Sequence, residues 1–447
     1  MNGNFRLSDF FRKSFTNLGR QLLEGGLQLL TIVLIARVYG PEGSGTLAMA
    51  LLVPQLLTSF LNLGLGSANV YYISSGRVSV QNAWQLTKKI YFILVFLGCV
   101  FQVVPLLFFD YLLRGIDYEY LVFSIFLFPL MLFVSFVSSF LQGAQLFNRL
   151  NVILLVSPAV AFFSLSIFHF LFESNFLVVL FIYFSSFSIS SLLGLVMIAD
   201  LMRSSRKCTK SQHSLAYRKN LLFYGLKSHL SSIVTFLNYK IDLLLIGFFL
   251  GALEAGLYVV AVQIGERLWM ISQSSGTILL PTLSSLDEFE KGRRDITVTV
   301  SCWVFVLTLL CAVALIALGY PFITLVFGEE YAVSYLILLL LIPGIIFGAP
   351  SRVIANDIAS RGKPEYNLYV SLAALVMNVL GNVMLIPELG VHGAAIATSF
   401  TYSVTFIMRY FLYCRFEKVS VLRLLVPSKL EVRKVVAKLK SIIYPKI

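Results

Sequence analysis

Charged residues are scarce in this chain of 447 residues. They make up 13% of it, against about 25% in soluble domains, while 58% of the residues are hydrophobic and the mean hydropathy is +0.85. Such a chain has too few polar side chains to cover a surface in water. The composition therefore excludes a soluble protein and predicts a polytopic membrane protein.

Cysteine is rare as well, and its spacing carries no metal or disulfide signature. The chain has five cysteines and no CxxC pair. All five lie in predicted spans or in the central loop: Cys99, Cys208, Cys302, Cys311 and Cys414. We therefore expect neither a disulfide framework nor a thiolate metal site, and we expect no bound cofactor.

Long apolar runs, in contrast, are abundant. Twelve stretches are apolar over about 20 residues, which is enough to cross a bilayer core of about 30 Å as a helix. They begin near residues 18, 45, 90, 119, 151, 176, 221, 255, 296, 332, 366 and 393. The first run, 18–40, is too long for the core of a signal peptide and has no small-x-small cleavage site, so we expect it to be retained. The predicted fold is all-α, with twelve transmembrane helices.

Basic residues are nearly absent from one side of this predicted topology. If both termini lie on the same side, that side holds 28 of the 35 lysines and arginines, and the other side holds one, Arg114. Basic loops stay on the cytoplasmic side of membrane proteins, so both termini are predicted to be cytoplasmic. The net charge of +13 is thus a topology signal, and we expect no nucleic-acid partner.

The two halves of the chain carry matching segments. RVYGPEGSGTLAMAL (37–51) aligns with FFLGALEAGLYVVAV (248–262), and a second match joins 141–152 to 360–371. The paired positions are Gly40 with Gly251, Gly45 with Gly256, Gln55 with Glu266, Gly143 with Gly362, and Asn148 with Asn367. Six spans per repeat is an even number, so both halves would share one orientation. This predicts two pseudo-symmetric six-helix lobes around a central cavity.

The predicted domain boundaries follow from these lobes and from the basic segments outside them. They are a cytoplasmic arm at 1–17, an N-lobe at 18–202, a basic cytoplasmic linker at 203–220, a C-lobe at 221–415, and a basic cytoplasmic tail at 416–447 that is partly an amphipathic helix.

Polar side chains at helical spacing predict the cavity walls. At about 100° per residue they gather on one face of spans one, two, seven and eight, which hold equivalent places in the two halves. These positions include Arg20, Glu24 and Gln28 on span one, Gln55, Ser59 and Asn62 on span two, Asn238 and Asp242 on span seven, and Gln263, Glu266, Arg267 and Gln273 on span eight. An asparagine stripe on span eleven is equally consistent with hydrogen bonds between helices.

Glu266 and Arg267 are the deepest predicted charges, within VAVQIGERLWMISQSSG (260–276). They lie about 12 residues, or about 18 Å, from the outer end of their span, so neither can reach a headgroup. Adjacent helical positions also diverge by about 100°, so the two cannot simply neutralise each other. Either each pairs with another helix, or both face a water-filled cavity. Arg352 and Asp357 follow two prolines in a later span and could stabilise a kink there.

Four segments resemble one group of transporters. They are IDLLLIGFFLGALEAGLYVVA (241–261), ILLPTLSSL (278–286), FITLVFGEEY (322–331) and NVLGNVMLIPELGVHGAAIATS (378–399). These segments resemble the polysaccharide-exporting branch of the multidrug/oligosaccharidyl-lipid/polysaccharide exporter superfamily, and within it the bacterial O-antigen flippases. The resemblance covers nearly the whole chain and is carried by glycines and prolines that let helices pack. Asp242 matches an aspartate common at that point of the family pattern.

The resemblance implies a flippase rather than an enzyme. It would move undecaprenyl-pyrophosphate-linked oligosaccharide units from the inner to the outer leaflet of the bacterial cytoplasmic membrane by alternating access. Its partners would be this cargo, membrane lipids and other polysaccharide assembly proteins.

The predicted cavity suits such a cargo. For the pyrophosphate we choose Arg267 and Arg20, because a guanidinium stays charged and binds phosphate oxygens bidentately. Sugars need amides and aromatic faces, which are available at Gln55, Asn62, Asn238, Gln263, Gln273 and Trp269. Coupling to H⁺ or Na⁺, as in an antiporter, has three acidic candidates: Glu24, Asp242 and Glu266.

Three alternatives remain open. A multidrug exporter of the same superfamily would present an acidic pocket to organic cations, whereas the deepest charge pair here includes an arginine. A lipid II flippase usually has fourteen spans, against the twelve counted here. A membrane glycan polymerase or ligase would be expected to carry a large outside loop, and the longest predicted outside loops hold about a dozen residues.

Overall fold

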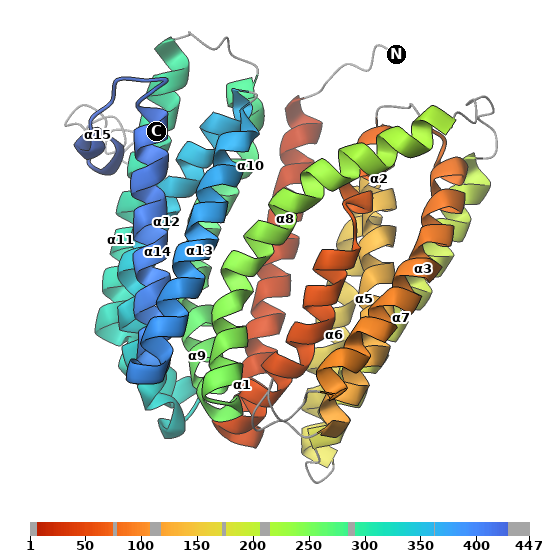
Figure 1. Cartoon of the computed structure of the whole chain (residues 1–447), viewed down its shortest axis with the longest axis horizontal. Helices are drawn as coiled ribbons and strands as arrows, with labels where there is room; N and C mark the ends of the chain where they lie inside the picture. The colour runs from red at the N-terminus through yellow and green to blue at the C-terminus, as the bar shows by residue number, and fades with distance from the viewer. Residues whose placement is uncertain are drawn as a thin grey trace, which may run out of the picture. The chain divides into compact units, whose positions relative to one another are not determined.

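The computed structural model of the protein describes residues 7–74, 78–107, 118–171, 176–205, 215–284, 291–361 and 363–427. Within those ranges all regular structure is helical, as predicted (Figure 1). Nine of the described helices are long and apolar enough to span a membrane, so the protein is a multi-pass membrane protein. The count of twelve spans stays a prediction.

The chain forms two compact units, Met1–Val259 and Val260–Ile447. The predicted lobes meet instead at the linker 203–220, part of which lies outside the described residues. The first unit contains α1 (Leu7–Leu61), α2 (Leu65–Ser74), α3 (Val80–Leu107), α5 (Tyr118–Gly143), α6 (Phe147–Leu171), α7 (Phe176–Ser205), α8 (Leu215–Phe249) and the first turns of α9 (Ala252–Glu266).

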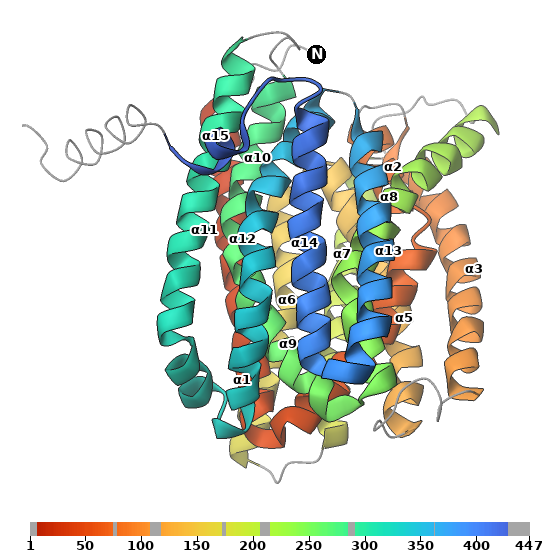
Figure 2. The ribbon, with the colours of Figure 1, turned by 60° about the vertical axis from the view of Figure 1, so that its left-hand side comes forward.

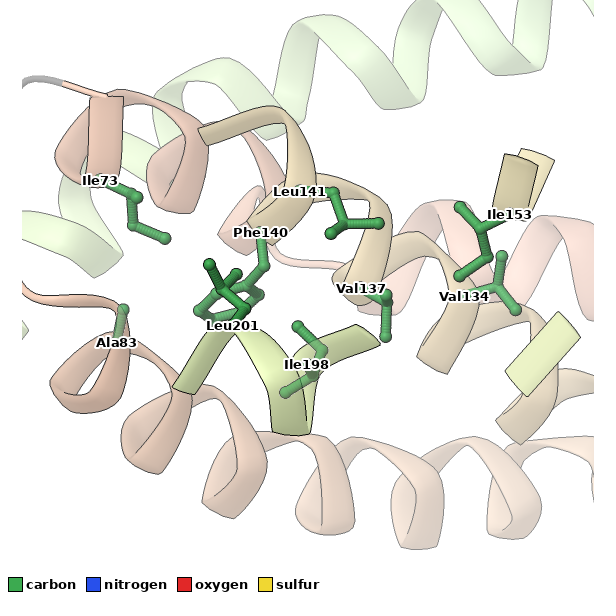
Figure 3. Packing of buried hydrophobic residues seen from close by; sticks show 9 residues of the cluster. All are labelled: Ile73, Ala83, Val134, Val137, Phe140, Leu141, Ile153, Ile198 and Leu201. Atoms are coloured by element: carbon green, nitrogen blue, oxygen red, sulfur yellow. The ribbon is translucent and has the colours of Figure 1, made fainter. Parts of the chain in front are cut away.

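The core of the first unit is built around α5. Figure 3 shows a cluster in which Val134, Val137, Phe140 and Leu141 of α5 pack among apolar side chains from four other helices. Those side chains are Ile73 of α2, Ala83 of α3, Ile153 of α6, and Ile198 and Leu201 of α7. All of them are at most 9% exposed, so α5 is the helix on which the others dock.

The first two predicted spans are joined in α1, which is broken at Gly40. That residue has φ 66° and ψ −169°, a conformation outside the helical region that glycine adopts without strain. Pro41 follows at once, and its missing N–H is no loss at the start of a helix. The Gly-Pro pair therefore ends one helix and starts another.

The second predicted span is also interrupted, by a turn between α1 and α2. Leu63 has φ 49° and Gly64 has φ 67°, both in the left-handed region. The Asn62 side chain accepts a hydrogen bond from the Gly66 backbone N–H at 3.2 Å and donates to the Ser135 hydroxyl of α5 at 3.2 Å. The amide thus fixes the turn onto α5, and the helical phase changes after Asn62.

The second unit is organised around α12. Its elements are the end of α9, η1 (Arg267–Trp269), α10 (Met270–Ser284), α11 (Lys291–Val326), η2 (Glu329–Tyr331), α12 (Ala332–Ser360), α13 (Pro364–Leu389), α14 (Val391–Tyr413) and α15 (Val421–Leu425). Figure 2 shows α11, α12, α13 and α14 running alongside one another. α12 packs against α14, α11 and α10, and it therefore occupies the place that α5 has in the first unit.

A buried ion network joins three segments at one end of the second unit. Asp357 accepts hydrogen bonds from Arg293 of α11 at 2.9 Å, from Arg361 at 3.0 Å and from Thr297 at 3.0 Å, and Arg361 also contacts Glu417 at 3.1 Å. Burial lowers the pKa of the Arg361 guanidinium, but the bonds to Asp357 and Glu417 outweigh it, so the pKa lies above its ordinary value. Asp357 thus ties α12 to α11 and to the segment after α14, a larger role than the predicted support of a kink.

The segment after α14 is attached to α11 by α15. Ser301 of α11 donates to the Leu424 carbonyl at 3.2 Å, and the Leu424 side chain is buried. The basic tail predicted to form an amphipathic helix lies, from residue 428 onward, outside the described residues.

Candidate functional site

Two glycines that the predicted repeat pairs have a similar backbone feature in the first unit. Gly40 and Gly251, which the alignment pairs, both have positive φ, at 66° and 106°. Each one ends a helix immediately before the segment that carries the polar stripe. A residue with a Cβ would be strained at either point, so both copies need glycine there.

The next aligned pair, Gly45 and Gly256, lies in direct contact where α1 crosses α9. A Cβ added to Gly45 would overlap the backbone of Ala252 and Gly256, and one added to Gly256 would overlap the backbone of Pro41 and Gly45. Each repeat therefore uses its glycine to admit the backbone of the other. This reciprocal contact is what a pseudo-two-fold relation between the repeats requires.

Asp242 lies beside this crossing, with a partner that the sequence analysis missed. Its side chain is 3% exposed and accepts hydrogen bonds from the Tyr258 hydroxyl at 2.5 Å and from the Leu243 backbone N–H at 2.8 Å. Tyr258 follows Gly256 on α9, so the carboxylate links α8 to α9. A tyrosine in an apolar run gives no signal of such a bond, because the bond depends on how two helices are rotated.

Arg20 and Glu24, predicted for the pyrophosphate and for coupling, form an ion pair one turn apart on α1. Their side chains are 11% and 26% exposed. A phosphate at Arg20 would therefore compete with the Glu24 carboxylate. The pair brings a predicted cargo group and a predicted coupling group together, which the sequence analysis treated separately.

The neutral polar residues predicted to bind sugar in the first unit differ in how many hydrogen bonds their side chains already make. Asn62 is committed to the turn after α1 on both sides of its amide. Asn238 donates to the Val234 carbonyl of its own helix at 3.1 Å. Gln55 is half-buried on α1. A sugar could use the Asn62 amide only by replacing bonds that hold the turn, so Gln55 and Asn238 are the better placed of the three.

In the second unit, the charged segment coincides with a break in helical geometry. α9 ends at Glu266, and the 3₁₀ turn η1 covers Arg267–Trp269 before α10 begins. The polar stripe was predicted for a continuous α-helix with about 100° per residue. That spacing is wrong beyond Glu266, because the 3₁₀ turn rotates the following side chains by a different angle. A 3₁₀ turn winds three residues per turn instead of 3.6, and such turns inside helices often mark functional hinges.

Arg267 and Gln263 meet across this break. The Arg267 guanidinium donates to the Gln263 side-chain oxygen at 3.0 Å, and both side chains are half-buried. Gln273, one turn beyond Trp269, is exposed. Arg267 and Gln263, which the sequence places on one face of span eight, are therefore neighbours, and their role in binding cargo stays a prediction.

Trp269 does not offer the exposed aromatic face that was predicted for it. The indole is 3% exposed, donates to the Ile345 carbonyl of α12 at 3.1 Å and packs edge-on against Tyr402. The guanidinium carbon of Arg352 lies 4.1 Å from the centre of its ring. A sugar could reach this face only if Arg352 moved.

The structure therefore adds Arg352 to the candidate site. A guanidinium stacked on an indole gains cation–π attraction and keeps its N–H groups directed around the ring edge. Arg352 contacts Trp269, and Arg267 lies two residues before Trp269 in η1. The described residues hold no group of three or more His, Cys, Asp or Glu side chains that could bind a metal ion.

Comparisons with known proteins agree on the fold. The structure of a lipid II flippase, MurJ, in an inward closed conformation superposes with a TM-score of 0.67 at 15% identity, over 95% of this chain and 98% of that one. An inward-facing multidrug resistance MATE family transporter superposes with a TM-score of 0.69 at 15% identity, over 89% and 96%. The names of these two proteins indicate different cargoes. The structural likeness therefore establishes the transporter fold and does not identify the cargo.

The sequence comparisons are more specific. A Shigella flexneri protein named "Putative O-antigen transporter" is 23% identical over 394 residues, which cover 85% of this chain and 92% of that protein. Residues 10–287, more than half of the chain, match the polysaccharide biosynthesis protein family. The protein is accordingly a member of the polysaccharide biosynthesis protein family.

Proposed function

We propose that the protein is a flippase for undecaprenyl-pyrophosphate-linked oligosaccharide units. It moves them from the inner to the outer leaflet of the bacterial cytoplasmic membrane by alternating access, and it catalyses no reaction on them. The observation that carries the proposal is the Arg267–Gln263 pair at η1, a cation and an amide set at a hinge-like break inside an apolar chain. The family and the near full-length O-antigen relative support the same cargo class.

Arg267 is the proposed anchor for the pyrophosphate. A guanidinium remains charged in an apolar surrounding and can hold two phosphate oxygens at once. Gln263 positions the guanidinium through the 3.0 Å hydrogen bond and offers its own amide to the sugar next to the phosphate. Arg352, stacked on the Trp269 ring at 4.1 Å, supplies a second positive charge in the same unit.

The proposed orientation places both termini in the cytoplasm. It rests on the distribution of the basic residues, 28 of 35 of which fall on that side in the twelve-span topology. Cargo would then enter from the leaflet in which lipid-linked sugars are made. Proteins that assemble polysaccharide would receive it on the opposite side.

Transport is proposed to be coupled to H⁺ or Na⁺ through buried or partly buried carboxylates. Asp242 is held by Tyr258, Glu24 is paired with Arg20, and Glu266 lies at the end of α9 next to Arg267. Protonating Glu24 would release Arg20 for a phosphate, so coupling and cargo binding would be linked at one ion pair.

Two alternative cargoes are an organic cation and lipid II. The structural likeness to a multidrug resistance MATE family transporter favours the first, and the likeness to the lipid II flippase MurJ favours the second. A membrane glycan polymerase or ligase is a third alternative with no structural observation in its favour. The positive charges of Arg267 and Arg352 disfavour an organic cation, and the near full-length relative named as an O-antigen transporter favours the oligosaccharide over lipid II.

Deletion and complementation test the proposed function. In a deletion strain we expect loss of surface polysaccharide and accumulation of undecaprenyl-linked units on the inner leaflet, and the wild-type gene should restore export. Arg267→Ala should accumulate in the membrane and fail to complement. Arg149→Ala is the matched control, because Arg149 pairs with Asp200 at an exposed position of α6 and α7. Normal surface polysaccharide in the deletion strain would refute the proposal.

A further inference from the structure

A cavity of about 380 Å³ lies in the first unit among α3, α5 and α7, away from every residue proposed for cargo. Its lining combines aromatic and aliphatic side chains with one lysine. The lining residues are Trp84, Thr87, Lys88, Tyr91 and Phe92 of α3, Phe133 and Phe136 of α5, and Leu195, Ile198, Ala199 and Met202 of α7. This volume falls within the usual range of small-molecule sites.

The sequence places these residues on single faces of two helices. The α3 positions follow the spacing i, i+3, i+4, i+7 and i+8, and the α7 positions follow i, i+3, i+4 and i+7. Both helices pack on α5 more than on each other, which leaves a space above the α5 side chains. The cavity is therefore a product of helix arrangement.

Aromatic contacts hold the walls in place. Trp84 packs edge-on against Phe133 and Phe140, with ring centroids 6.3 and 5.3 Å apart. Tyr91 packs edge-on against Phe133 and Phe136, and its hydroxyl donates to the Pro129 carbonyl at 3.1 Å. Each ring is thus fixed by several neighbours, so the cavity is preformed and does not collapse by simple side-chain rotation.

The polar end of the cavity is basic. Gln81 donates to the Met202 carbonyl at 3.2 Å, which brings the start of α3 and the end of α7 together. Lys88 and Lys89, both exposed, and Arg203 in the last turn of α7 lie toward this end. In the proposed topology this end meets the cytoplasmic headgroups, and Trp84 stands at the depth that tryptophan favours in membranes.

The side of the cavity away from these cations opens onto apolar surface. Phe92 and Leu195, both lining residues, are 60% and 48% exposed. In a membrane protein such a surface faces lipid chains. A ligand entering here would bring a hydrocarbon chain from the bilayer and leave a headgroup beside Lys88.

The geometry points to a binding site for an anionic glycerophospholipid of the cytoplasmic leaflet, with one acyl chain in the cavity and its phosphate on Lys88. Lys88 is the one basic residue in the lining, and Lys89 and Arg203 lie outside it. The lipid-linked cargo is the less suitable occupant, because none of the amides or arginines proposed to bind glycan and pyrophosphate lines this cavity. The cavity and its lysine do not depend on the proposed cargo, whereas the assignment to the cytoplasmic leaflet rests on the proposed orientation.

Native mass spectrometry of the purified protein tests the site. The protein is incubated with phosphatidylglycerol, phosphatidylethanolamine or undecaprenyl phosphate, and bound lipid is counted. We expect phosphatidylglycerol to be retained about fivefold better than phosphatidylethanolamine, the factor that one basic group near an anionic headgroup provides. Lys88→Gln should remove that preference. Equal retention of the two phospholipids by the wild type, or displacement of phosphatidylglycerol by equimolar undecaprenyl phosphate, would overturn the inference.

A second pair of variants tests the cavity itself. Ala199→Trp fills it and should reduce retention of phosphatidylglycerol several-fold, whereas Val196→Trp, on the exposed face of the same helix and outside the lining, should not. Thermal unfolding of both variants establishes that they fold. Equal retention of phosphatidylglycerol by the two variants would refute the cavity as the site. If Ala199→Trp does not fold, the Lys88→Gln variant decides: loss of its preference for phosphatidylglycerol supports the site, and persistence of that preference refutes it.

Discussion

The part of α1 after Gly40 and the α9–η1–α10 segment are the two copies of the predicted repeat, and they differ in helical geometry. Both begin after a glycine with positive φ, and their second glycines lie against each other. The first copy then remains α-helical through Gln55 to Leu61. The second leaves α-helical geometry at Arg267, one residue after Glu266, which the alignment pairs with Gln55.

The comparison distinguishes features common to both copies from the charged residues that only the second copy has. They share backbone conformation and close helix packing, which need small residues and no charge. Only the second copy places a carboxylate and a guanidinium at mid-span, together with a turn of looser hydrogen-bond geometry. We infer that the shared features build the transporter and that the charged break in one copy gives it an anionic cargo.

The largest effect is expected from disrupting the close contact between Gly45 and Gly256, in which both copies take part. Gly256→Ala or Gly45→Ala would place a Cβ inside the partner backbone, so the helices must separate, and we expect a loss of about 3 kcal/mol with export abolished. Thermal unfolding in detergent and surface polysaccharide are the measurements. Gly26→Ala, in open space on α1, is the control and should leave both unchanged. Unaltered unfolding of Gly256→Ala would disprove the tight crossing.

The next largest effect is expected from removing Arg267, the guanidinium that only the second copy carries. Arg267→Ala should reduce export at least tenfold at normal protein level, and Arg267→Lys should keep partial export, because the charge survives without the bidentate geometry. Arg149→Ala, which removes an exposed ion pair with Asp200, should stay within about twofold of wild type. Immunoblots and polysaccharide analysis report both. If Arg267→Ala fails to accumulate, Arg267 is a structural partner of a buried acid and not an anchor.

A smaller effect is expected at the bond between α8 and α9. Tyr258→Phe removes a 2.5 Å hydrogen bond to the Asp242 carboxylate and should lower stability by about 1.5–3 kcal/mol. If Asp242 exchanges a proton, Asp242→Asn should fold and transport without dependence on a pH gradient across vesicles. An Asp242→Asn variant that keeps this dependence would remove the residue from coupling.

The smallest effect concerns the Arg20–Glu24 pair. Because it is an i, i+4 pair with partly exposed side chains, Glu24→Gln should change stability by less than about 1 kcal/mol. Its effect should fall on transport, where Arg20 would no longer have a carboxylate competing for it. A pH profile of transport by Glu24→Gln that matches the wild-type profile would contradict a coupling role.

Much of this architecture could be predicted from the sequence, because hydropathy and glycine spacing act locally. The apolar runs located the helices, and the offset between Gly40 and Gly251 identified two glycines that both have positive φ. The Arg267–Gln263 neighbourhood was also predicted, since residues four apart meet on any helix.

What could not be predicted depends on how helices are rotated against one another. The Tyr258–Asp242 bond, the burial of Trp269 beneath Arg352, and the contacts of Asp357 with α11 all join segments that are adjacent only after packing. The break at η1 was hidden for another reason. Residues 267–269 contain no glycine or proline, so propensity alone favours an uninterrupted helix.

Translocation by the purified protein tests the central claim most directly. Proteoliposomes carrying an undecaprenyl-pyrophosphate oligosaccharide in both leaflets are treated with an external glycosidase, and the protected fraction is followed over time. We predict that wild-type protein makes the protected inner pool accessible, that Arg149→Ala does the same, and that Arg267→Ala leaves the pool protected as in protein-free vesicles. An inner pool that stays protected with wild-type protein, or one lost equally fast with Arg267→Ala, would contradict the account.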